Sequence, residues 1–279
     1  MHPRLLTTLI LIDPVIFKDP VTGPPDDKSS IFYASTFRRD LWPSRQAAEA
    51  SFRKSPFYRT WDPRVLDRWT EHGIRALPTR IYPDSSKEGS ADNPVTLTTT
   101  KHQEVWTFLR PNFGGRDLEG RPVHDRSSHA DLDQASSGTY PFYRPEPTTA
   151  FNNLPFLRPS VLYIFGGKSN LAAPEWRKQK MAITGIGTGG SGGAKEGRVK
   201  EVLFKAVGHL VAMEAVTDTA EATTQWLDQE IRRWRQAERS YRELRSRRKA
   251  ADDIMVNEDW IHNLGGRLSA RILDSPAKL

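Results

Sequence analysis

Three short apolar segments constrain the fold of this chain more than any other feature. They read "LTTLILIDPVI", "SVLYIFGGKS" and "RVKEVLFKAVGH", and they centre on residues 9–12, 161–165 and 199–204. Continuous runs of branched apolar residues that end at glycine, proline or a polar loop are typical of parallel strands buried on both faces. Because the carboxyl ends of parallel strands meet at one edge of a sheet, we expect Asp13 and His209 to share that edge.

Helical segments alternate with these strands. After the third strand, "TDTAEATTQWLDQEIRRWRQAERSYREL" carries apolar residues at helical spacing, namely Leu227, Ile231, Trp234 and Tyr241. One face of this segment is therefore expected to pack, while the rest is charged. Strands that alternate with helices predict an α/β fold, and 37% apolar residues in a chain of 279 suffice for a sizeable core.

The long stretch between the first and second strands has a different character. It is rich in Trp, Phe and Arg, prolines divide it into helix-length segments, and Thr100 and Gln103 stand at capping-box spacing. We interpret it as a helical cap inserted into the sheet domain. Within it, 84–93 and 114–140 are polar and rich in glycine or serine, which predicts mobile loops. The predicted divisions are 1–27 for the first strand and its loop, 28–157 for the cap, 158–250 for the rest of the core, and 251–279 for a tail.

The basic excess of the chain is concentrated in one segment. The net charge is +7, and "RRWRQAERSYRELRSRRK" (232–249) holds the densest run of arginines, with Glu238 and Glu243 between them. Interleaved charges of this kind are typical of a solvated helix face, and no aromatic single-strand platform or zinc finger accompanies them. We therefore expect no nucleic-acid partner, and a basic binding module is the third of our functional hypotheses.

Several kinds of site are not expected. The chain has no cysteine, which excludes disulfides, thiolate zinc sites and a cysteine nucleophile. His124, Asp125, His129 and Asp131 lie in a loose polar segment, which favours a solvated loop over a metal cluster, so we expect no metal or cofactor. The run "LLTTLILI" is too short for a membrane span, which needs about 20 apolar residues, and it predicts a buried strand instead.

A literal G-x-S-x-G pattern occurs in "GTGGSGGAK" around Ser191. A working nucleophile elbow needs an apolar strand running into the motif and a helix leaving it. Here the upstream segment is charged and then glycine-rich, and the downstream segment leads into a strand. We therefore predict that Ser191 lies in a loop.

The segment "KAVGHLVAMEAV" is the most informative for chemistry. His209 stands one residue past a glycine at the carboxyl end of a strand, where α/β sheets place catalytic loops. Glu214 is well placed to cap the following helix or to steady the loop. The alternative is a hydrogen-bonded structural histidine, since histidine is often intermediate in burial.

These segments resemble a known family. "LILIDPVI", "VLYIFGGKS" and "AVGHLVAMEAV" look like the sixth, seventh and eighth strands of the α/β-hydrolase fold, with G-H-x-x-x-x-E around the catalytic histidine. "STFRRDLWPS", "SPFYRTWDPRVLDRW", "TLTTTKHQEVWTFLRPNF" and the GTGGSGG loop resemble the fungal toxin-biosynthesis-type α/β hydrolases, relatives of peroxisomal lipase-like hydrolases. The resemblance implies that His209 is the general base of ester or thioester hydrolysis in secondary-metabolite or toxin biosynthesis.

The chain departs from the family pattern at the nucleophile. Members of the fold carry five strands, an oxyanion loop and the nucleophile elbow before the sixth strand, whereas this chain opens at the sixth. We therefore expect only strands 6–8 with the inserted cap, a bare flank of apolar sheet, and a truncated chain that is inactive alone. The alternative is a non-catalytic fragment or a binding protein for an apolar ligand or partner.

The acid of the implied triad has two candidate positions. Where the family usually carries an acid after the seventh strand, this chain has Lys168, Ser169 and Asn170. The acid can instead follow the sixth strand, as in haloalkane dehalogenases, and that position is Asp13. Asp-Pro at this strand end also occurs in hydrolases whose acid lies elsewhere, so both interpretations stay open.

Aromatic residues of the cap are the candidates for substrate binding. They are Trp42, Phe57, Tyr58, Trp61 and Trp69. Aromatic side chains at this density are expected to form an apolar pocket over His209 that accepts a small apolar ester or thioester. The alternative is that they form the core of the cap.

The chain ends in Ala277-Lys278-Leu279, a close variant of the S-K-L peroxisomal address. The import receptor needs a free carboxylate on a flexible tail, and "DSPAKL" supplies one after Pro276. We therefore predict a peroxisomal protein that binds the import receptor through these three residues. The alternative location is the cytoplasm.

Overall fold

The chain forms two compact units, residues 1–227 and 228–279. The computed structural model describes residues 5–18, 28, 30–83, 93–113, 117–119, 121, 127–131, 142–248 and 254–266. The sheet, the cap and the candidate site all belong to the first unit. Among the described residues, no helix is both long enough and apolar enough to cross a membrane.

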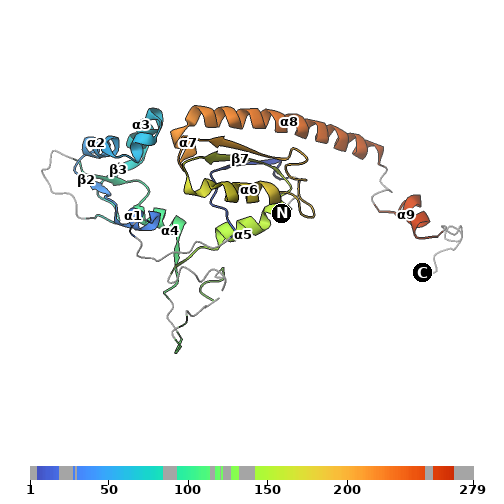
Figure 1. Cartoon of the computed structure of the whole chain (residues 1–279), viewed down its shortest axis with the longest axis horizontal. Coiled ribbons are helices and arrows are strands. Elements are labelled where there is room, and N and C mark those ends of the chain that lie inside the picture. The colour runs from blue at the N-terminus through green and yellow to red at the C-terminus, as the bar shows by residue number, and fades with distance from the viewer. Residues whose placement is uncertain are drawn as a thin grey trace, which may run out of the picture. The chain divides into compact units, whose positions relative to one another are not determined.

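A three-stranded parallel sheet forms the core of the first unit (Figure 1). Its strands are β1 (Thr8–Ile12), β7 (Ser160–Gly166) and β8 (Val199–Phe204), in the order β1-β7-β8. Ile12 pairs with Ile164 of β7, and on the other side of β7 Phe165 pairs with Leu203 of β8. The predicted parallel neighbours and the α/β class are therefore confirmed.

The central strand β7 is buried on both faces, as its continuous apolar sequence requires. Val161, Tyr163 and Phe165 point to one face, where they pack with residues of α6 (Pro174–Ile183) such as Met181. Leu162 and Ile164 point to the other face and pack against Val211 and Trp226. Trp226 lies near the beginning of α8 (Val216–Arg247), and Figure 1 shows α6 and the beginning of α8 on opposite sides of the sheet.

Within the described residues, β1 pairs with β7 alone. Leu5 and Leu6 just before it and Ile12 at its end are exposed. Among the described residues this strand edge is therefore open to pairing with another strand. The position of β1 matters for the candidate site because Asp13 directly follows the last residue of this strand.

The segment that we interpret as a cap contains strands as well as helices. Its helices are α1 (Ile31–Phe37), α2 (Arg45–Lys54), α3 (Pro63–His72) and α4 (Lys101–Phe108). It also contains an antiparallel sheet in the order β2-β4-β3, formed by Leu41–Trp42, Val95–Leu97 and Ile74–Ala76. The sequence does not predict this sheet, because strands of two or three residues are too short to show a period of two. The cap has its own core, in which Phe52 and Leu66 are buried together with Leu97.

The predicted helix start at Thr100 is confirmed. The Thr100 hydroxyl accepts a hydrogen bond from the Gln103 backbone N–H at 3.1 Å, and the Gln103 side chain accepts one from the Thr100 N–H at 3.1 Å. This reciprocal pair satisfies two backbone donors that the first turn of α4 leaves free. Of the two predicted mobile loops, 84–92 and most of 114–140 lie outside the described residues.

The remaining elements are short. They are η1 (Tyr58–Thr60), β5 (Arg110–Pro111), β6 (Phe142–Tyr143), α5 (Glu146–Asn153), η3 (Leu154–Phe156), η4 (Asn170–Ala172), α7 (Val211–Glu214) and α9 (Glu258–Asn263). The second unit holds α8 from Asp228 onward together with α9, whose first turn is capped by Asn257. The tail residues 277–279 lie outside the described residues.

Candidate active site

Asp13 and His209 meet at one edge of the parallel sheet, as predicted. Asp13 follows β1, and its carboxylate Oδ2 lies 2.7 Å from Nδ1 of His209. The other carboxylate oxygen accepts a hydrogen bond from the Gly166 N–H at 3.3 Å. The Asp13 side chain is 0% exposed and the His209 side chain 43%. The pair therefore consists of a buried acid and an imidazole that reaches the surface of the site.

The backbone of Asp13 turns sharply to aim the carboxylate. Its φ of 41° lies in the left-handed region, which Asp tolerates better than most residues. The Asp13 N–H still donates to the Ile164 carbonyl at 2.7 Å, so the residue stays anchored to β7. Strain held in place by a hydrogen bond and full burial is a common feature of residues with a functional role.

The loop that carries His209 is held by close packing. The Gly208 N–H donates to the Glu214 carboxylate at 2.8 Å, which agrees with the loop-steadying role predicted for Glu214. Gly166 leaves no room for a side chain, since a Cβ there would lie 1.9 Å from the Gly208 carbonyl oxygen. The contact between the end of β7 and this loop therefore sets where the imidazole stands.

The pairing with Asp13 also determines the free nitrogen of the imidazole. An ionised carboxylate can only accept, so Nδ1 carries the proton and Nε2 of the neutral ring is an acceptor. Within the described part of the chain, Nε2 of His209 has no hydrogen-bond partner. An exposed, oriented imidazole with a free acceptor nitrogen is suited to take a proton from a nucleophile.

A cavity of about 750 Å³ opens beside His209. On the core side it is lined by the histidine loop, including Leu210 and Met213, and on the cap side by aromatic residues. The aromatic residues are Phe57, Tyr58, Trp61, Trp69 and Phe108. Tyr58 and Trp61 pack with ring centroids 4.9 Å apart, and Trp61 and Trp69 with centroids 5.7 Å apart. The predicted aromatic wall over His209 is therefore present.

Trp42 is the exception among the five predicted aromatic residues. It lies in the core of the cap, 4% exposed, and does not line the cavity. Its ring packs against Phe52 at a centroid distance of 5.2 Å. The prediction was wrong for this residue because β2 turns its side chain into the cap, a direction that a two-residue strand does not reveal in sequence.

One wall of the cavity is polar, which the sequence analysis did not foresee. Arg38 Nη2 lies 2.6 Å from Glu104 Oε2, and the Ser35 hydroxyl donates to the same carboxylate at 3.1 Å. Tyr58 stands near this pair, and burial raises the pKa of its phenol. Ser35 belongs to α1 and Arg38 follows that helix directly, whereas Tyr58 belongs to η1 and Glu104 to α4. Only the folded chain brings them together.

The cap is joined directly to the histidine loop. The Asp62 N–H donates to the Met213 carbonyl at 2.8 Å, and an Arg64 Nη donates to the Thr217 hydroxyl at 3.2 Å. Arg64 also donates a hydrogen bond to the Asp62 carboxylate, and this bond lowers the pKa of Asp62 to about 2. The Asp62–Met213 backbone hydrogen bond thus links the segment that carries the aromatic wall to the loop that carries His209.

Sequence comparison finds relatives of this chain among fungal proteins. No family model matches. The type I acyl-CoA thioesterase mpaH′ of Penicillium brevicompactum is 40% identical over 270 residues, which are 93% of this chain and 61% of that protein. The abhydrolase domain-containing protein AFT2-1 of Alternaria alternata is 26% identical over 275 residues, 95% of this chain and 90% of that protein. The chain is therefore similar in sequence to a fungal acyl-CoA thioesterase and to a fungal abhydrolase domain-containing protein.

The solved structures that resemble this chain have lower sequence identity to it. The peroxisomal α/β-hydrolase Lpx1 of Saccharomyces cerevisiae is 14% identical with a TM-score of 0.49, over 92% of this chain and 58% of that one. The thioesterase domain from the curacin biosynthetic pathway is 13% identical with a TM-score of 0.40, over 80% of this chain and 59% of that one. The chain spans 61% of the length of the Penicillium thioesterase mpaH′.

Ser191 does not line the cavity beside His209. It lies in the loop between α6 and β8, as predicted, where its N–H donates to the Leu157 carbonyl at 2.9 Å. The one Ser or Thr hydroxyl among the described lining residues belongs to Thr60, and it donates to the Phe57 carbonyl at 2.8 Å.

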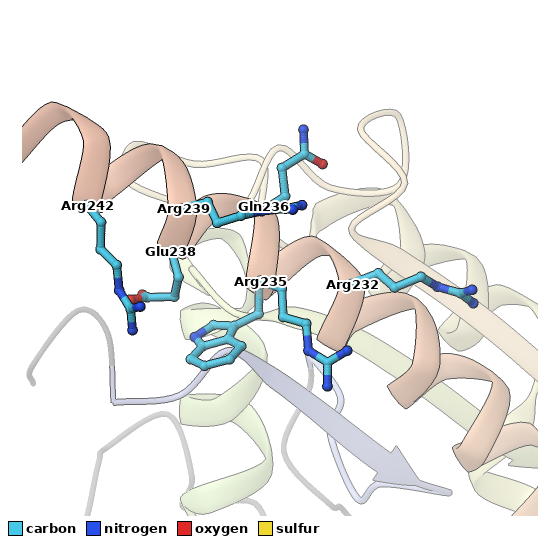
Figure 2. Close-up of a pocket in the computed structure, with 7 residues that line it drawn as sticks. Arg232, Arg235, Gln236, Glu238, Arg239 and Arg242 are labelled. Carbon is cyan, nitrogen blue, oxygen red and sulfur yellow. The ribbon is translucent and has the colours of Figure 1, made fainter.

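The basic segment forms a solvent-facing stripe on α8 in the second unit. Figure 2 shows Arg232, Arg235, Arg239 and Arg242 on this helix, with Glu238 among them. The spacing of three and four residues places the arginines along one side of the helix. A single helix with interleaved charges agrees with the solvated face that the sequence predicts.

The predicted absence of a metal cluster concerns a segment that is only partly described. His124 and Asp125 lie outside the described residues. His129 Nε2 lies 3.2 Å from the Pro111 carbonyl oxygen, and Asp131 pairs with Arg110. Among the described residues, no group of three His, Cys, Asp or Glu side chains is placed to hold a metal ion.

Proposed function

We propose that this chain carries the acid–base half of a hydrolase that cleaves small apolar esters or thioesters. The observation that carries the proposal is the 2.7 Å contact between the buried Asp13 carboxylate and Nδ1 of His209, which lines an aromatic cavity. The 40% identity to acyl-CoA thioesterases supports a thioester as the substrate. His209 is then the general base and Asp13 the residue that orients it.

The chemistry of this pair is acyl transfer. A hydroxyl oxygen attacks the thioester carbonyl carbon while His209 Nε2 accepts the hydroxyl proton. The carbon–sulfur bond breaks, and the protonated imidazole returns that proton to the leaving thiolate. Water then attacks the acyl ester formed on the hydroxyl through the same two proton transfers and releases the carboxylic acid product. Asp13 holds the Nδ1 proton throughout and stabilises the transient imidazolium.

The nucleophile is the part that the described residues do not supply. Thr60, the one lining Ser or Thr, already donates its hydroxyl proton to a carbonyl, and no described serine lines the cavity. We propose that the nucleophilic hydroxyl lies outside the 279-residue chain and that the chain alone is inactive. Loss of the serine from a triad lowers turnover on the order of a millionfold.

The test is a thioesterase assay with acyl-CoA substrates and a thiol reagent, which reads only the released coenzyme because the chain has no cysteine. We expect no hydrolysis above background by the 279-residue chain. A version extended by the segment encoded upstream in the same reading frame should hydrolyse the substrates, and His209→Ala should abolish this. His102→Ala, at an exposed histidine of α4, is the matched control.

Two outcomes would contradict separate parts of the proposal. Hydrolysis by the 279-residue chain alone that is lost in His209→Ala would refute an external nucleophile. Hydrolysis that survives His209→Ala, or none in the extended protein, would refute the function itself.

A second candidate function is non-catalytic binding of an apolar ligand, which the aromatic wall favours. The lining includes Trp61 and Trp69, so a bound ligand should change the intrinsic tryptophan fluorescence. Saturable quenching by a non-hydrolysable acyl-CoA analogue, together with inactivity of the extended protein, would favour this alternative. Quenching together with turnover would favour the hydrolase.

We also propose that the protein is imported into peroxisomes through Ala277-Lys278-Leu279. The proposal rests on the small, basic and aliphatic order of these terminal residues. A fluorescent protein fused to the amino terminus should co-localise with a peroxisomal marker and become diffuse when Leu279 is deleted. A diffuse signal from the intact fusion would refute the address and favour the cytoplasm.

A further inference from the structure

Lys180 is a buried cation without a hydrogen-bond partner. It lies on α6, on the face of the sheet that packs Tyr163 and Phe165, and it is 1% exposed. Among the described residues its Nζ makes no hydrogen bond. The ammonium instead stands 5.6 Å from the centroid of the Phe165 ring, a cation–π distance.

This position opposes folding unless another charge compensates the ammonium. A methionine of similar length would avoid the desolvation of a cation, and buried charges are normally paired. Burial lowers the pKa of Lys180 to about 8, and the negative charge of Asp13 acts in the opposite direction. The interior therefore contains an attraction between Lys180 and the acid of the candidate site.

The backbone explains why these two groups influence each other. The Asp13 N–H binds the Ile164 carbonyl, and the Gly166 N–H binds the Asp13 carboxylate. The acid is thus attached to the residues on either side of Phe165, whose ring lies beside the Lys180 ammonium. Lys180 and Asp13 are both buried, and charges in a protein interior are screened less than in water.

The other charges near Lys180 are already compensated. Arg177 lies over the same Phe165 ring at 5.9 Å, but both carboxylate oxygens of Glu201 on β8 stand 3.1 Å from its guanidinium. Within the part of the chain that the structure describes, no Lys or Arg forms an ion pair with Asp13, so its carboxylate has no cationic partner while His209 is neutral. Its two hydrogen-bond donors are then uncharged groups.

Further charges face His209 from the cavity. Lys168 and Glu214 stand on the core side, and Arg38 and Glu104 pair with each other on the cap side. Glu214 is bound by the Gly208 N–H. Lys180 does not line this cavity, and among the described residues its Nζ has no hydrogen bond to any of these groups.

We propose that Lys180 is a positioning residue of the candidate site: its ammonium is the buried counter-charge of Asp13, which keeps the carboxylate a moderate acceptor for the His209 Nδ1 proton. The lysine acts through Asp13 and touches no reacting atom. The sequence retains a side chain that is unfavourable for packing because the acid needs it.

The first test measures the titration of Lys180 by NMR, with lysine side chains labelled with ¹³C. We expect Asp13→Asn to lower the pKa of Lys180 by about half a unit or more, since the attraction that raises it is lost. Asp67→Asn, at an exposed acid of the cap, is the matched control and should leave it unchanged. An unchanged pKa in folded Asp13→Asn would overturn the proposal.

The second test does not require an Asp13 variant. The His209 Nδ1 proton that binds Asp13 should give a downfield proton resonance, and Lys180→Met should move it further downfield because Asp13 becomes a stronger acceptor. Lys178→Met, at an exposed lysine of the same helix, should not move it. A purely structural lysine would leave the resonance in place, and that result refutes the counter-charge.

The inference concerns the same pair as the proposed function, but neither test needs turnover or substrate. A shifted resonance in a protein that never hydrolyses a thioester would refute the function and leave the charge pair standing. If the extended protein is active, Lys180→Met should lower kcat at unchanged KM, because the lysine does not contact the cavity.

Discussion

Replacement of Lys180 by methionine should stabilise the protein, and the gain should depend on pH in a defined way. The pKa of Lys180 is about 8 in the folded protein and 10.5 as its reference value. The folded state therefore holds its proton less tightly than the unfolded state does. By linkage, the destabilisation is fully present below pH 8 and disappears as the pH rises toward 10.5.

The size of the effect follows from that shift. One pKa unit corresponds to about 1.4 kcal/mol, so the charged lysine costs about 3 kcal/mol of unfolding free energy at pH 7 and about 1 kcal/mol at pH 10. Methionine has no charge to desolvate and nearly the same length. Any change in packing that it introduces is the same at both pH values, so the difference between the two measurements isolates the charge.

The assay is urea unfolding of the wild type and Lys180→Met at pH 7 and pH 10, followed by tryptophan fluorescence and circular dichroism. We expect the stability advantage of the variant to shrink by about 2 kcal/mol between the two conditions. Lys178→Met should differ from the wild type by less than about 0.5 kcal/mol at both. An advantage of Lys180→Met that is equal at pH 7 and pH 10 would show that the buried lysine titrates normally and would refute the reasoning.

Four further substitutions test the site and the cap. Gly166→Ala should lower the melting temperature and abolish the downfield His209 resonance, because the new Cβ would lie 1.9 Å from the Gly208 carbonyl; an intact resonance would contradict this. Thr100→Ala should cost about 1 kcal/mol in urea unfolding through loss of the capping box, and no change would mean that α4 does not need its cap. Trp69→Ala should weaken binding of an acyl-CoA analogue more than it weakens folding, whereas Trp42→Ala should do the reverse by about 3 kcal/mol or more; equal effects of the two would reject the assignment of separate roles.

The sheet and the histidine could be predicted because their signals are local. Each strand is a continuous apolar run, and right-handed parallel topology places the ends of such runs at one edge. Asp13 follows the first apolar run, and His209 lies in the loop after the third. The parallel topology of the strands was therefore enough to predict that the two residues lie close together. Thr100 and Gln103 were likewise readable, since a capping box lies within four residues.

The polar wall and the buried lysine could not be predicted, because their partners are distant in the chain. Ser35 and Glu104 are 69 positions apart, and nothing near either residue indicates the other. Lys180 stands in a charged helix of ordinary composition, and its burial depends on how α6 packs on the sheet. The prediction for Trp42 failed for a similar reason, since the orientation of its side chain depends on a three-stranded sheet assembled from segments far apart in sequence.

The attachment of the cap to the histidine loop links recognition to chemistry in the proposed function. The Asp62 N–H holds the Met213 carbonyl, and Met213 belongs to the short helix α7 that follows His209. Because Trp61 precedes Asp62 directly, a shift of the aromatic wall would pull on the loop that positions the imidazole. An acyl group that fills the cavity without displacing this wall should therefore meet His209 in its paired orientation with Asp13. A group too large for the cavity would disturb that pair before it reached the free nitrogen.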